Sequence, residues 1–185
     1  RWVARRTLFD LRLRVEMTSY FQMSDMLYPN PDGTPGNPDR LNPKGLVRRT
    51  DYTPKPAYFV YQCLCALFDS ETQWADLPLE VSAADGHPLE ETSLVKVAFV
   101  RQGKPLYVYW LPNDLRKEPR LRTADLAIPE ASGATMDAPV LIDPLTACVH
   151  RLPQSVPSQG RWEIAGVPLG DCPLIVTDRS AIELV

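Results

Sequence analysis

Beyond Asp69, the chain is divided into short apolar runs separated by turn residues. The clearest pair is Leu94–Val100 and Leu106–Trp110, which flank a tight turn containing Gly103. Short apolar runs bounded by Gly, Pro and Asp are typical of antiparallel strands joined by hairpins. The pattern predicts an antiparallel β-sandwich over residues 94–185. The further expected strands are Thr123–Ala127, Pro139–Ile142, Ala147–Leu152, Arg161–Ile164 and Leu174–Thr177.

The first hairpin is apolar at successive positions, not only at alternate ones. Because neighbouring side chains of a strand point to opposite faces of the sheet, both faces of this hairpin are expected to be covered. One face would pack inside the sandwich. The other requires a second surface, which we expect residues 1–69 to help to form.

Residues 1–69 have a different pattern. Two amphipathic helices are expected, Trp2–Leu13 and Ala57–Asp69, the second beginning at or next to Pro56. Between them, Val15–Phe21 is rich in strand formers and precedes a long loop. The order helix, strand, loop and helix predicts a parallel α/β unit. Residues 70–93 are interpreted as a linker carrying the first sandwich strand, around Leu79–Ser82.

Three segments resemble known proteins. Gly45–Tyr58, which reads Gly-Leu-Val-Arg-Arg-Thr-Asp-Tyr-Thr-Pro-Lys-Pro-Ala-Tyr, resembles the closing turn of the barrel of clan A glycoside hydrolases. Val140–Thr146 and Val167–Thr177 resemble strands of the accessory β-domain that follows this barrel. The resemblance implies that residues 1–69 are the C-terminal portion of a (β/α)8 TIM barrel: helix 7, strand 8, a long loop and helix 8. An accessory β-sandwich would follow.

The same resemblance implies a function. The chain would be the C-terminal segment of a glycosidase, contributing part of the wall of the sugar-binding pocket and a supporting sandwich. Closed barrels of this type take about 250 residues, so the remainder of the barrel is expected upstream of Arg1. Both catalytic glutamates would lie there as well. The chain alone is therefore expected to be inactive, and we assign no catalytic residue within it.

Substrate contacts are expected at the C-terminal end of the proposed strand, where barrel enzymes bind their ligands. An aromatic ring can stack on the apolar face of a sugar, and amide or carboxylate groups can bond its hydroxyls. The alternatives are that the rings are core residues, that Asp25 caps a loop, and that Tyr28 lies on a plain surface loop. The candidate substrate-binding residues are Tyr20, Phe21, Gln22, Ser24, Asp25 and Tyr28.

The formal net charge of this 185-residue chain is −3, which does not favour a nucleic-acid partner. No apolar run is long enough to suggest a membrane span. The two histidines and four cysteines do not have the spacing of a metal site. We therefore expect no metal or other cofactor, and the resemblance to clan A enzymes implies carbohydrate as the ligand.

An alternative function is a noncatalytic carbohydrate-binding or structural β-sandwich protein. In that case aromatic residues of the sandwich would form a flat platform for a sugar, although the same residues are also suited to a core. The platform candidates are Trp74, Tyr107, Tyr109, Trp110 and Trp162.

Overall fold

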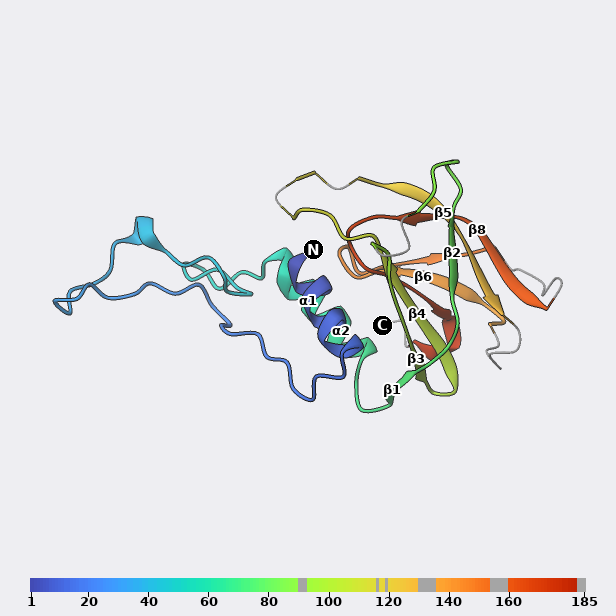
Figure 1. The fold of residues 1–185 in the computed structure, drawn as a ribbon. Coiled ribbons are helices and arrows are strands. Elements are labelled where there is room, and N and C mark those ends of the chain that lie inside the picture. The colour runs from blue at the N-terminus through green and yellow to red at the C-terminus, as the bar shows by residue number, and fades with distance from the viewer. Residues whose placement is uncertain (90–92, 116, 119, 130–135, 154–159, 183–185) are drawn as a thin grey trace.

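In a computed structural model, two antiparallel sheets pack face to face and two helices lie beside the larger sheet (Figure 1). The structure describes all residues except 90–92, 116, 119, 130–135, 154–159 and 183–185. The larger sheet has six strands in the order β1-β3-β4-β9-β6-β7, and the smaller has three in the order β2-β5-β8. The elements are α1 (Trp2–Arg12), η1 (Pro38–Arg40), α2 (Pro56–Leu67), β1 (Thr72–Ala75), β2 (Glu80–Ala83), β3 (Val95–Arg101), β4 (Lys104–Trp110), β5 (Arg122–Pro129), β6 (Pro139–Asp143), β7 (Cys148–Arg151), β8 (Arg161–Leu169), β9 (Leu174–Asp178) and η3 (Arg179–Ala181).

The hairpin expected from the sequence is formed by β3 and β4, which pair from Val95 with Trp110 to Arg101 with Lys104. Its two turn residues, Gln102 and Gly103, have φ angles of 52° and 73°. Positive φ at both central residues is the geometry of a two-residue turn whose twist matches that of the flanking strands. The local sequence thus sets the register of this hairpin.

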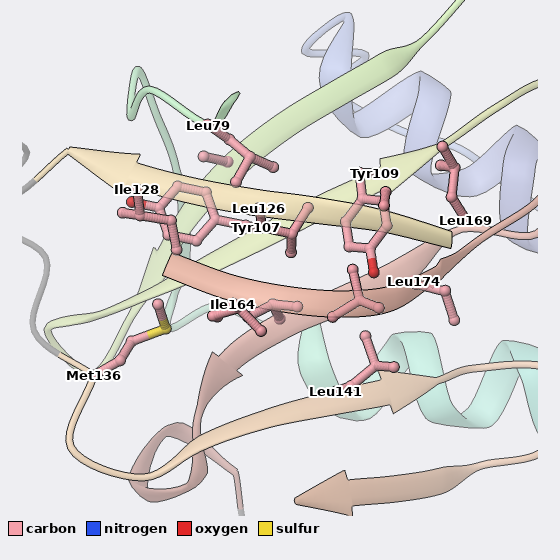
Figure 2. Close-up of a cluster of buried hydrophobic side chains, with 14 residues drawn as sticks. Leu79, Tyr107, Tyr109, Leu126, Ile128, Met136, Leu141, Ile164, Leu169 and Leu174 are labelled. Atoms are coloured by element: carbon pink, nitrogen blue, oxygen red, sulfur yellow. The ribbon is translucent and has the colours of Figure 1, made fainter. Parts of the chain in front are cut away.

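The core between the two sheets is built around two tyrosines of β4 (Figure 2). Tyr107 and Tyr109 have no exposed surface, and Trp110 is buried on the opposite face of the same strand. The Tyr109 hydroxyl donates a hydrogen bond to the Pro168 carbonyl at 3.1 Å, and burial raises the pKa of this tyrosine. These three aromatic residues are core residues and do not form an exposed platform.

The second face of the six-stranded sheet packs against both helices. Val3, Leu8 and Leu64 of the helices share a buried cluster with Phe99 and Val108 of the sheet. The expectation that both faces of the hairpin are covered is confirmed. The covering surface, however, is a layer formed by α1 and α2 and not a barrel.

The expected TIM-barrel portion in residues 1–69 is wrong. All strand pairings within the two sheets are antiparallel, and the described residues before Thr72 contain no strand. Val15–Phe21, expected as the eighth barrel strand, is an irregular segment with Met17 and Phe21 largely exposed. Strand-forming residues make a strand only when a neighbouring backbone pairs with them, and none does so here.

The segment between the helices, residues 13–55, extends away from the sandwich (Figure 1). It is held together by isolated bridges, including Ser24 with Val47 and Met26 with Asn42. Its two arms approach closely at Gly45, where an added Cβ would lie 2.3 Å from the backbone nitrogen of Asp25. A larger residue would separate the arms at that point.

Candidate functional site

A pocket of about 420 Å³ lies between α1, the start of the 13–55 segment and α2. It combines aromatic rings with hydroxyl, amide and cationic groups. Its lining residues are Trp2, Val3, Arg6, Thr7, Thr18, Ser19, Tyr20, Phe21, Gln22, Lys44 and Tyr61. Three of the residues expected to bind substrate, Tyr20, Phe21 and Gln22, are therefore brought together.

Tyr20 is the central ring of the pocket. Its centroid lies 6.4 Å from that of Trp2 on α1 and 6.0 Å from that of Tyr61 on α2. The hydroxyl donates a hydrogen bond to the Lys44 carbonyl at 2.8 Å. Burial, with a smaller effect from the negative charge of Asp25, raises the pKa of Tyr20. Tyr20 therefore stays neutral and joins both helices to the loop.

Phe21 and Gln22 offer different chemistry to a ligand. Phe21 is 80% exposed, so its ring face is free to contact another molecule. Gln22 is only 7% exposed. Its Nε2 makes a long hydrogen bond of 3.4 Å to the Asn42 carbonyl, and its Oε1 has no partner among the described residues. An apolar surface and an unused acceptor therefore lie next to each other in the chain.

Asp10 fixes the position of the loop relative to α1. Its Oδ2 accepts hydrogen bonds from Arg6 Nε at 2.8 Å and from Thr18 Oγ1 at 2.7 Å. The hydrogen bond from Arg6, followed by that from Thr18, lowers the pKa of the Asp10 carboxyl. Because Thr18 is two residues before Tyr20, this contact positions the wall of the pocket.

The other three candidate residues lie outside the pocket lining. Asp25 forms an ion pair with Lys55, the residue that precedes α2, and its Oδ1 accepts a hydrogen bond from the Gly45 nitrogen at 3.0 Å. The Ser24 hydroxyl donates to the Asp25 carbonyl at 3.2 Å. Tyr28 is half exposed. Asp25 thus joins the loop to the helix, and binding roles for these residues stay predictions.

The sequence interpretation did not include several lining residues among its candidates. Trp2 and Arg6 are four residues apart, a spacing that places them on one face of a helix. That spacing was the available signal. Their position opposite Tyr61 depends on how α1 packs against α2, which local periodicity does not specify.

The pocket around Tyr20 is lined by aromatic rings and by hydroxyl, amide and cationic groups. None of its lining residues is an Asp or Glu. Within the described part of the chain, no group of three or more His, Cys, Asp or Glu residues is placed to hold a metal ion. No described helix is long and apolar enough to cross a membrane. Neither a scan against protein-family models nor a search of curated proteins gives a match to the chain.

Proposed function

We propose that this chain is a noncatalytic, sugar-contacting part of a glycoside hydrolase, in which the pocket around Tyr20 forms one wall of the sugar site. The observation that carries the proposal is the combination in one pocket of the exposed Phe21 ring and the unused acceptor of Gln22. Sugars require this combination, because their rings have apolar C–H faces and hydroxyl edges.

Each side of a sugar ring has a complementary group in this pocket. The Phe21 ring would stack on the C–H face. Gln22 Oε1, which is buried in the structure, would accept a hydrogen bond from a hydroxyl after the side chain turns toward the sugar. The Arg6 guanidinium, whose Nε is bonded to Asp10, would donate through its other nitrogens. Tyr20 and Tyr61 supply the apolar floor.

The pocket would bind a sugar without cleaving it. Glycoside hydrolysis generally needs two carboxyl groups, about 5–5.5 Å apart in retaining enzymes. Because no carboxyl group lines the pocket, the catalytic glutamates would come from another part of the enzyme. The sequence resemblance of Gly45–Tyr58 to clan A enzymes is the reason to name a hydrolase, although in the structure this segment does not close a barrel.

Apolar side chains next to the pocket would contact the catalytic part of the enzyme. Leu13, Met17 and Met23 are 59%, 83% and 64% exposed, respectively, and lie within a few residues of the pocket wall. Large apolar side chains gathered in one exposed segment are typical of a surface that meets another protein surface.

The proposal is tested by titrating residues 1–185 with gluco-, manno-, xylo- and galacto-oligosaccharides, followed by amide chemical shifts. We expect saturable binding of at least one series. Phe21→Ala should weaken it by about tenfold, because a stacked aromatic contributes on the order of 1 kcal/mol beyond its buried area. Met17→Ala is the matched control, since its side chain is equally exposed and absent from the pocket lining.

The same samples are assayed for release of nitrophenol from aryl glycosides, and none is expected. Sugar binding that is unchanged in Phe21→Ala would exclude this pocket. If that binding were lost on replacement of Trp74 or Trp162 instead, a freestanding carbohydrate-binding protein would be the better interpretation. Failure of every sugar to bind would contradict both.

A further inference from the structure

A second pocket, of about 620 Å³, lies in the sandwich and is also lined by Arg1, the residue that precedes α1. One wall is β8, one of the two edge strands of the three-stranded sheet, and the facing wall comes from β6, β7 and β9 of the larger sheet. The three-stranded sheet is too narrow to cover the whole inner face of the six-stranded sheet. The pocket lies at the edge of the smaller sheet, where the inner face of the larger one is left uncovered.

The walls of this pocket are mainly apolar. Leu141, Val167 and Leu174 belong to the core cluster between the sheets, and Leu152 packs against that cluster. Figure 2 shows Leu141 on β6 pointing toward the smaller sheet. Pockets that bind small molecules have volumes of about 300–1,000 Å³ and are lined chiefly by apolar groups with a few polar ones. This pocket meets both conditions.

Asp171 is one of the polar residues that line the pocket, with Arg1, Asp143 and His150, and it is 1% exposed. Its Oδ2 accepts a hydrogen bond from Arg1 at 2.6 Å and lies 4.0 Å from Arg5. Its Oδ1 is buried and has no hydrogen-bond partner among the described residues. A buried acceptor without a donor is costly, so this oxygen is suited to receive a donor from a ligand.

We propose that this pocket binds a neutral amphiphile, with its apolar tail between Leu141 and Val167 and a hydroxyl that donates to Asp171 Oδ1. The charged side chains at the pocket favour an amphiphile whose polar end is uncharged. An ammonium group would approach the guanidinium groups of Arg1 and Arg5, which already balance the carboxylate. An anionic head would instead meet Asp143 as well as Asp171.

Two isomeric probes test the hydroxyl without changing the protein. 1-Octanol and 1-methoxyheptane have the same atoms and a similar length, but only the alcohol donates a hydrogen bond. We expect 1-octanol to cause saturable amide shifts at Gly166, Val167 and Cys172. The ether should bind about tenfold more weakly, because a hydrogen bond to a charged acceptor is stronger than one between neutral groups.

A pair of variants locates the tail. Leu145 lines the pocket and Val149 does not. The two side chains are matched in exposure, at 38% and 36%. Val149 pairs with Ile142, whose side chain lies in the cluster on the helix side of the sheet. Leu145→Asp should weaken octanol binding several-fold, whereas Val149→Asp should leave it unchanged. Equal effects of the two variants would place the probe elsewhere.

The remaining outcomes are also decisive. Absence of saturable octanol binding would overturn the proposal, and equal affinity of the alcohol and the ether would overturn the assigned role of Asp171. This site is independent of the proposed sugar site. Octanol binding should therefore persist in Phe21→Ala, so failure of one proposal is distinguishable from failure of the other.

Discussion

Buried carboxylates determine where the 13–55 segment meets the helices. Asp10 joins α1 to Thr18, and Asp25 joins the loop to Lys55 at the start of α2. Asp10 is 5% and Asp25 is 4% exposed, and both carboxylates accept hydrogen bonds from the loop or its flanking residues. A charge buried at this depth is tolerated because donors compensate it. We therefore expect the role of both carboxylates to be to hold the 13–55 segment in place against the helices.

Asp10 is expected to make the stability of the fold depend on pH. Its pKa in the folded protein is lowered, whereas an unfolded Asp titrates at about 3.9. Above this value, the hydrogen bonds from Arg6 and Thr18 contribute fully to stability. As the pH falls through the lower folded value, the carboxyl is protonated and the contribution is lost. We expect the urea midpoint to decrease below about pH 4.

The control for this prediction is Asp10→Asn, which keeps the shape of the side chain without its charge. The difference in unfolding free energy between the parent and Asp10→Asn should be constant near neutral pH and become smaller below about pH 4. A difference that is independent of pH would show that the charge of Asp10 does not stabilise the fold.

At the scale of elements, substitutions in α2 test whether the helix layer packs against the six-stranded sheet. Leu64 is 1% exposed and packs with Val60 against the six-stranded sheet. Leu64→Ala should lower the unfolding free energy by about 2–5 kcal/mol, because it removes buried apolar surface and leaves a cavity. Gln62→Ala, on the exposed side of the same helix, should change it by less than about 0.5 kcal/mol. Chemical denaturation measures both, and equal effects would contradict the packing of α2 on the sheet.

Local sequence signals located most helices and strands, but they indicated the partner of a strand only where a hairpin joins the two. Pro56 begins α2 as expected, and the hairpin turn at Gly103 follows from its local residues. By contrast, Val15–Phe21 has strand-forming residues and forms no strand. Residue preferences act within a few positions, whereas a strand needs a distant backbone for its hydrogen bonds. The barrel expectation came from the resemblance of short segments, which do not specify such a distant partner.

The candidate site shows the same limit. Tyr20, Phe21 and Gln22 were candidates because they end the expected barrel strand; that strand is absent, yet the three residues line one pocket. Trp2 and Tyr61 join them only through the packing of two helices that are far apart in the sequence. Asp25 does not line the pocket and forms an ion pair with Lys55, 30 positions later in the chain. Local sequence patterns indicate neither the packing of the two helices nor the ion pair between Asp25 and Lys55.

For the whole molecule, the helix layer and the sandwich should unfold as one unit. Without residues 1–69, the outer face of the six-stranded sheet would expose side chains that are at most 3% exposed in the full chain, including Phe99, Leu106, Val108 and Trp110. An apolar patch of this kind promotes self-association. Residues 70–185 alone should therefore bind a hydrophobic dye, associate at micromolar concentration and lose cooperative unfolding.

The full chain, residues 1–185, serves as the reference in the same measurements, with sedimentation velocity and thermal unfolding as readouts. Arg101 provides a second connection across the proposed boundary, because its guanidinium bonds to Asp69 at 2.8 Å as well as to the Ala181 carbonyl. If residues 70–185 remain monomeric and unfold at the midpoint of the full chain, the helices contribute no stability to the sheet. The boundary near residue 70 would then separate two independent folding units, and the pocket around Tyr20 would belong entirely to the first.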